Sequence, residues 1–194
     1  MGALHRKLHE QRGASMLMAL FLLLVALMVS AVVIAAASSA ATTLRSDKAQ
    51  EQSSLAVSSA AEYVRDAFLG KEMDGTIVTR GTSTTYTSDS GGAFRDFVSY
   101  AVPELYRNQN ALPRRTYRLR LSGDTMEDVW ADFEMSFGTN ENTEYPTYIL
   151  TVTLRNWETT PGEHPCSMTL LLCSNLGGSN RRAVTWDGYN VIQR

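Results

Sequence analysis

The three histidines are the side chains best suited to catalysis or metal binding, and their surroundings argue against both roles. His5 and His9 are four residues apart with Glu10 beside them, a spacing that places two zinc ligands on one helix face. The order differs from His-Glu-x-x-His, and the pair lies in a short basic leader. His164 would have to serve any Ser-His-Asp or Cys-His arrangement, but its glycine and proline neighbours mark a loop. We therefore expect no catalytic residue, no histidine metal site and no cofactor.

Acidic residues gather near one predicted strand start. Asp124, Glu127 and Asp128 lie close together in the sequence, with Asp132 shortly after them. They are weak candidates for an extracellular calcium site, because carboxylate oxygens suit Ca²⁺ but the regular spacing of an EF-hand is missing. Solvated carboxylates at the end of a strand are the favoured interpretation.

Arginines form a basic stripe just before these acids. Arg114, Arg115, Arg118 and Arg120 are weak candidates for nucleic-acid contact. The formal net charge of -2 gives no general attraction to nucleic acid, and no glycine-rich phosphate loop is present. Alternating arginines are common on the wet face of a strand, so a solvated face is favoured.

A long apolar segment near the amino terminus is the first element that the sequence predicts. Met16 to Ala37 is apolar except for Ser30, and no charge occurs between Ala14 and Thr43. About 22 residues at ~1.5 Å rise per residue span ~33 Å, enough to cross a bilayer as a helix. A cleaved secretory signal is the alternative, since small residues follow the segment, but such signals have a shorter apolar core.

Charge indicates the orientation of this segment. Arg6, Lys7 and Arg12 precede it, whereas the basic residues after it are offset by neighbouring acids. The positive-inside preference predicts an amino terminus in the cytoplasm and about 150 carboxy-terminal residues outside, in a single-pass inner-membrane or cytoplasmic-membrane protein.

The helix is expected to continue beyond the membrane. No glycine or proline occurs from Ala14 to Leu69, and Gly70 stands where a left-handed cap would end the helix. In the second half, apolar residues recur with helical spacing, which predicts one face that packs on a sheet. That face comprises Val57, Ala61, Val64 and Phe68.

The remainder of the chain predicts a sheet. Residues 70–113 read as loop, or as a weak exposed hairpin in their Thr-rich part, with a short helix from Phe94 that Pro103 limits. After Pro113 the hydrophobic period becomes two, and short polar connections imply antiparallel order. The last strand has an alternative interpretation as a hairpin that turns at Asp187 and Gly188. The expected strands are Tyr117–Leu121, Val129–Phe137, Tyr148–Leu154, Cys166–Cys173 and Val184–Ile192.

Cys166 and Cys173 are the only cysteines. On an extended strand their Cα atoms would be about 23 Å apart, at ~3.3 Å per residue, which is too far for a disulfide unless a turn intervenes. We expect two buried or half-buried thiols. The fold class is α+β: a long N-terminal helix, membrane-spanning in its first half, packed on a C-terminal antiparallel sheet.

The segment GlnArgGly-AlaSerMetLeuMetAlaLeuPheLeuLeuLeuValAlaLeuMet, after a basic leader and before a sheet, resembles a type IV prepilin. The resemblance implies cleavage between Gly13 and Ala14 by a prepilin peptidase. Major subunits of that family carry Glu at the fifth mature position, where this chain has Met18, so it is more similar to a minor pilin or pseudopilin.

The resemblance implies five segments. They are a leader (1–13), the transmembrane and filament-core half of the helix (14–43), its outer half (44–69), a loop and short-helix region (70–113) and the sheet domain (114–194).

The function expected from this resemblance is structural. The chain would be a subunit of a pilus-like or type II secretion-like filament, with membrane lipid before assembly and other pilin subunits afterwards as partners of its N-terminal helix. It would have no small-molecule substrate. The alternative is an uncleaved, signal-anchored surface-binding domain that forms no filament.

Overall fold

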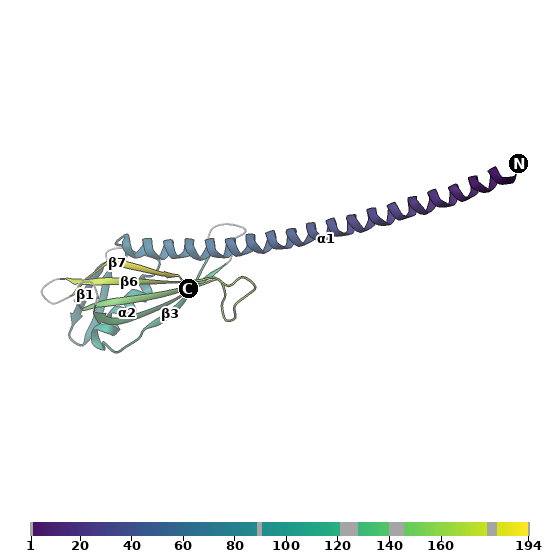
Figure 1. Cartoon of the computed structure of the whole chain (residues 1–194). Coiled ribbons are helices and arrows are strands. Elements are labelled where there is room, and N and C mark those ends of the chain that lie inside the picture. Colours follow the sequence, from purple (N-terminus) through teal and green to yellow (C-terminus); the bar gives the residue numbers. More distant parts are fainter. Residues whose placement is uncertain (1, 89–90, 121–127, 140–145, 178–181, 194) are drawn as a thin grey trace. The chain divides into compact units, whose positions relative to one another are not determined.

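A computed structural model describes residues 2–88, 91–120, 128–139, 146–177 and 182–193, with side chains for these ranges except 2–15 and 187–193 (Figure 1). The chain divides into two compact units, Met1–Lys48 and Ala49–Arg194. The elements in chain order are α1 Gly2–Leu69, β1 Gly75–Arg80, β2 Ser83–Ser88, α2 Arg95–Arg107, β3 Arg114–Leu119, β4 Val129–Thr139, β5 Pro146–Arg155, β6 Ser167–Gly177 and β7 Ala183–Gln193.

Seven strands form one antiparallel sheet in the order β2-β1-β7-β6-β5-β4-β3. Strands β4 to β7 are each hydrogen-bonded to the strand before them in sequence, which short connections allow. The early hairpin β1–β2 joins the far edge, where Gly75 and Thr76 pair with the start of β7. A hairpin from the first half of the chain thus extends the sheet beyond its last strand, β7.

The outer half of α1 covers one face of this sheet. Between Ala49 and Leu69 its buried residues are four alanines with Ser53, Val57, Val64 and Phe68, so the helix backbone can approach the strands closely. The last helical hydrogen bond runs from the Gly70 amide to the Asp66 carbonyl at 2.8 Å. The left-handed residue after the helix is Lys71 at φ 65° and not Gly70, so the prediction of a cap at Gly70 is wrong by one residue. The predicted α+β arrangement, a long helix on an antiparallel sheet, is confirmed.

Phe133 is the centre of the core. Its ring lies 4.8 Å from Phe94, 5.5 Å from Phe97, 5.1 Å from Tyr117 and 6.4 Å from Phe68, measured between centroids. These rings come from α1, the start of α2, β3 and β4. One aromatic cluster therefore ties both helices to the same sheet face.

One expectation about the short helix is wrong. Pro103 does not end the short helix: α2 runs to Arg107, because Val102 and Leu105 continue its buried face and outweigh the one amide donor that proline lacks. Of the two interpretations of the Thr-rich stretch, the hairpin is the one observed: β1 and β2 pair on either side of Gly81 at φ 60°. Only one side of β2 is exposed, because its alternate residues Thr84, Tyr86 and Ser88 are buried.

The Asp187–Gly188 pair is not a hairpin turn. β7 continues through it as one strand, and the pairing with β6 shifts there, with Cys173 opposite Gly188 and Ser174 opposite Trp186. Asp187 is the extra residue of a β-bulge, and glycine is a common residue in one class of such bulges.

Ser174, which lies opposite Trp186 beside the bulge, also bonds to β5 on its other side. Its hydroxyl oxygen accepts a hydrogen bond from the Tyr148 amide at 3.0 Å, one residue beyond the end of the regular β5–β6 pairing at Ile149. The Thr147 hydroxyl in turn donates to the Ser174 carbonyl. Thr147 and Ser174 are both buried. Their hydroxyls therefore continue the hydrogen bonding between β5 and β6 beyond the regular backbone pairing.

Candidate functional site

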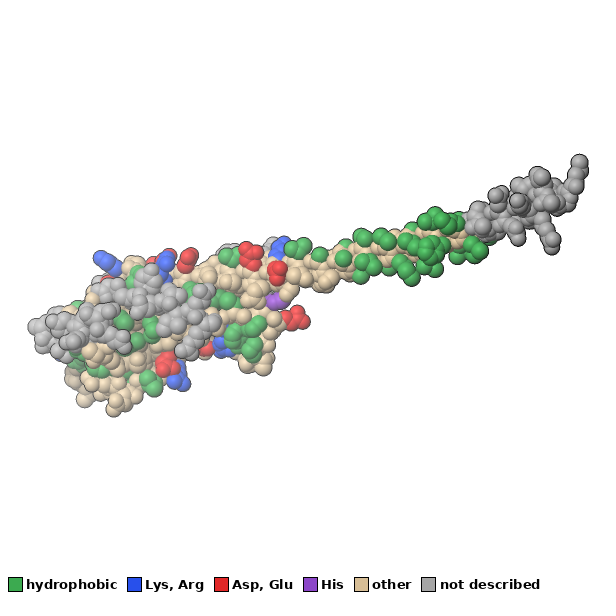
Figure 2. Space-filling view, viewed as in Figure 1, with side chains coloured by type: hydrophobic (Ala, Val, Ile, Leu, Met, Phe, Trp, Pro, Cys, Tyr) green, Lys and Arg blue, Asp and Glu red, His purple; other side chains and the backbone are tan. Residues whose placement is uncertain are grey.

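The first half of α1 exposes an unbroken apolar surface. Every large apolar side chain from Met16 to Ile34 is between 40% and 72% exposed, including Met18 at 65%. Figure 2 shows these side chains gathered along the helix. The helix is long and apolar enough to cross a membrane: an 18-residue window has a mean hydropathy of 3.1, and none of it is buried. A helix from the core of a soluble protein would be buried instead, so this segment is compatible with a membrane anchor.

Polar side chains in this half bond to their own helix. The Ser30 hydroxyl donates to the Ala26 carbonyl at 2.8 Å, and the hydroxyls of Thr42 and Thr43 donate to the Ser39 carbonyl at 2.7 and 3.1 Å. A hydroxyl satisfied in this way can enter an apolar environment with little desolvation cost.

The predicted processing residues Gly13 and Ala14 lie within α1, where the structure describes only the backbone. Met18 presents a thioether and methylenes in place of a carboxylate. Because no charge occurs from Ala14 to Thr43, no side chain of this segment can neutralise the amino terminus of a neighbouring helix.

The predicted basic stripe is neutralised by carboxylates. Arg114 pairs with Glu134 at 2.7 Å, and Arg115 pairs with Asp96 of α2 at 2.7 Å. Arg118 and Arg120 both reach Asp128, the latter at 3.7 Å. Nucleic-acid binding relies on arginines that are available to neutralise phosphates. Each of these four arginines already contacts a carboxylate, so a phosphate would have to compete with it.

Arg115 points away from the other arginines because it lies on the helix-facing side of β3. There Asp96 also accepts a hydrogen bond from the Tyr117 hydroxyl at 2.7 Å. Partial burial, and then this hydrogen bond, raise the pKa of Tyr117 well above its ordinary value. The hydroxyl therefore remains a donor and joins β3 to α2.

The acidic group is only partly described, since Asp124 and Glu127 lie outside the described residues. Asp128 is held by the two arginines, and Asp132 accepts a hydrogen bond from the Thr116 hydroxyl at 2.6 Å and pairs with Arg155 at 2.9 Å. Among the described residues, no three His, Cys, Asp or Glu side chains are placed to hold a metal ion.

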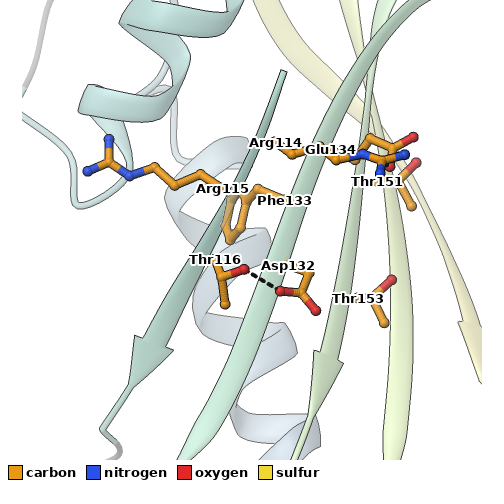
Figure 3. Close-up of a pocket in the computed structure, with 8 residues that line it drawn as sticks. All are labelled: Arg114, Arg115, Thr116, Asp132, Phe133, Glu134, Thr151 and Thr153. Atoms are coloured by element: carbon orange, nitrogen blue, oxygen red, sulfur yellow. Dashed lines mark hydrogen bonds and ion pairs between the residues drawn. The ribbon is translucent and has the colours of Figure 1, made fainter. Parts of the chain in front are cut away.

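A shallow depression of about 340 Å³ opens on the sheet face that points away from the helices (Figure 3). The pair Arg114–Glu134 borders it on one side, and Thr116 with Asp132 on the other. The side chains of Thr151 and Thr153 project from the adjoining β5. This group is assembled by cross-strand register: Glu134 lies opposite both Arg114 and Thr151, and Asp132 opposite Thr116 and Thr153.

A second depression of about 500 Å³ follows along β4 toward its start. It is lined by Asp128 and Trp130 and by the β5–β6 connection with Glu163 and His164. Asn156 shapes that connection: its side-chain amide donates to the His164 carbonyl at 2.9 Å, and its oxygen accepts from the Cys166 amide at 2.9 Å. The described contacts thus use the backbone of His164.

The cysteines are both half-buried thiols and do not form a disulfide. Cys166 packs against the core, whereas Cys173 alternates with the buried Leu172 and Ser174 and so lies on the opposite sheet face.

Sequence reasoning identified Arg114, Arg118 and Asp128 but missed Arg155, Glu134 and the two threonines as their neighbours. Alternation predicted which residues of β4 and β5 face solvent, but not the register that brings them together. Comparison with known proteins gives no further identification, because no family model, no curated protein and no solved structure matches the chain.

Proposed function

We propose that this chain is a structural subunit of an extracellular filament of the type IV pilus or type II secretion kind, processed after Gly13 by a prepilin peptidase. One observation carries the proposal. α1 is continuous from an exposed, charge-free apolar half to an outer half that buries an alanine-rich face against an antiparallel sheet.

The apolar half explains why assembly would follow membrane insertion. Fifteen large side chains exposed to water would be strongly unfavourable, at roughly 25 cal/mol per Å² of apolar surface. Such a helix is stable in lipid, and it can leave lipid only if other helices bury the same surface. A filament core built from copies of such helices supplies that burial.

Met18 favours a minor subunit. Without a carboxylate near the new amino terminus, this chain cannot neutralise the terminal amine of a neighbour, so it is less suited to repeated stacking than a major subunit. The proposal assigns the chain no catalytic role, and its partners are the prepilin peptidase, membrane lipid and other subunits.

The test is the intact mass and amino-terminal sequence of protein from membranes and from sheared surface material. We expect a chain that begins at Ala14 in a host with prepilin peptidase, and the full precursor for Gly13→Leu. Gly2→Leu is the matched control, because it changes another leader glycine and should leave processing intact.

Other results would contradict the proposal. A wild-type chain that begins at Met1 in that host would favour the anchored surface-binding domain. A chain that begins after Ala40 would indicate a cleaved secretory signal and a protein released from the membrane.

A further inference from the structure

The outer face of the sheet carries a row of polar side chains along β4 that the filament proposal does not use. Trp130, Asp132 and Glu134 alternate on this face, and Asp128 precedes them. The two depressions lie one after the other beside this row, over a length of about 20 Å at ~3.3 Å per residue. The row is therefore long enough for an extended ligand.

The face is electrically balanced. Arg114 and Arg155 contact Glu134 and Asp132, and Arg118 and Arg120 share Asp128. Glu163 beside the second depression is the fourth carboxylate, so among the described residues four arginines face four carboxylates. An anionic ligand would have to displace these carboxylates, and a cationic ligand the arginines. A neutral ligand can bind while every ion pair stays in place.

Hydrogen-bonding capacity nevertheless remains. Each carboxylate has lone pairs beyond those used by its arginine, and each guanidinium has five N–H groups, of which the contacts above use only some. The hydroxyls of Thr151 and Thr153 line the first depression and make no side-chain hydrogen bond within the part of the chain that the structure describes. Donors, acceptors and hydroxyls thus alternate over a small area.

Trp130 adds a flat apolar surface to this row. The Arg118 guanidinium lies over one face of its ring, 5.4 Å from the ring centre, which leaves the other face for a ligand; Trp130 also lines the second depression. Aromatic rings in binding sites accept the C–H face of a ligand while polar neighbours orient it.

Known classes of ligand differ in what they need from such a face. A protein partner favours an apolar interface centre depleted of charge, and a nucleic acid favours arginines without carboxylate partners. A sugar offers hydroxyls that both donate and accept, together with an apolar C–H face. The paired charges, the threonine hydroxyls and the single tryptophan of this face are therefore complementary to a sugar.

We infer that the outer face of β4 and its neighbours β3 and β5 binds neutral oligosaccharides, with Trp130 as the stacking platform and Asp132, Glu134, Thr151 and Thr153 as the main hydrogen-bonding groups. This inference does not depend on filament assembly or on cleavage at Gly13.

The test is ligand-observed NMR with the full-length protein in a detergent that lacks a sugar headgroup. The probes are maltotetraose, cellotetraose and tetra-N-acetylchitotetraose, and a heparin tetrasaccharide is the anionic comparison. We expect millimolar or tighter binding of at least one neutral probe and much weaker binding of the heparin fragment.

Variants locate the site. Trp130→Ala should weaken binding about tenfold, because it removes the stacking surface. Thr151→Val with Thr153→Val should weaken it about fivefold, because it removes two hydrogen-bonding hydroxyls. The valine pair keeps the shape and strand preference of threonine, so it should fold normally. Trp157→Ala is the matched control, because Trp157 lines neither depression, and its affinity should equal that of wild type.

Three outcomes would overturn the inference. One is no saturable binding of any neutral probe, and another is preferential binding of the heparin fragment. The third is a folded valine pair and a folded Trp130→Ala that bind as wild type does. None of these bears on where the amino terminus is cleaved, so failure here leaves the filament proposal unaffected.

Discussion

At the scale of single residues, Ser174 shows how a side chain can extend the pairing of two strands. The hydroxyl replaces a backbone acceptor for the Tyr148 amide at a buried position. Serine is therefore needed for the structure at this position. Residue preferences alone would have placed it in a loop.

Ser174→Ala should lower the free energy of unfolding by about 1 to 3 kcal/mol, because it leaves the buried Tyr148 amide without its acceptor. Urea unfolding followed by circular dichroism measures this. Ser136→Ala on the outer face of β4 is the control and should change stability by less than about 0.5 kcal/mol. Equal effects for the two variants would contradict the assigned role.

At the scale of elements, the connection between β5 and β6 is held by Asn156. Its side chain joins the two ends of the loop through the His164 carbonyl and the Cys166 amide, each at 2.9 Å. The Asn156 amide adds a backbone bond to the Cys166 carbonyl at 3.2 Å, and the Arg155 guanidinium bonds to the carbonyls of Trp157 and Glu158. Of these contacts, the Asn156 side chain provides two of the three that reach residues 164 and 166.

Asn156→Ala should increase hydrogen exchange across residues 157–166 and lower the free energy of unfolding by about 1 to 2 kcal/mol, because two backbone groups lose their partner. Hydrogen exchange with mass spectrometry measures the loop directly. Thr160→Ala, an exposed change within the same loop, should leave exchange unaltered. Unchanged exchange in Asn156→Ala would show that the backbone bond alone suffices.

At the scale of the whole molecule, the two halves of α1 face different environments. In the second unit the helix has a buried side and a wet side, whereas the apolar half has no buried side at all. Membrane association should therefore depend on the first half alone.

Replacing Leu23 and Leu27 with arginine should move the protein from the membrane to the soluble or aggregated fraction, because two arginines at the centre of a span cost about 5 to 7 kcal/mol. Fractionation of cell membranes with a carbonate wash measures this. Leu44→Arg with Leu55→Arg is the matched control: both leucines are exposed on the same helix but lie outside the central apolar run. Retention of the first variant in membranes would contradict the anchor.

Much of the architecture was predictable, and the reasons are physical. The period of two around Phe133 and Val152 and the glycine-free run up to Leu69 each reflect one burial pattern over many residues. Pro103 misled because a local rule was outweighed by tertiary packing. The Asp187–Gly188 pair left a strand and a hairpin equally open, and pairing with β6 decides for the strand. The candidate site was least predictable, because the association of Arg155 with Asp132 depends on strand register.

The self-contained hydrogen bond of Ser30 has a consequence for how helices would recognise each other. From Met16 to Ala37 a neighbour meets only methyl, methylene, thioether and phenyl groups, none of which forms a directional bond. Shape alone distinguishes one sliding position along this stretch from the next. Charged contacts after Thr43 would then have to set the register between adjacent copies. The apolar half would contribute non-specific packing between helices and would not determine their register.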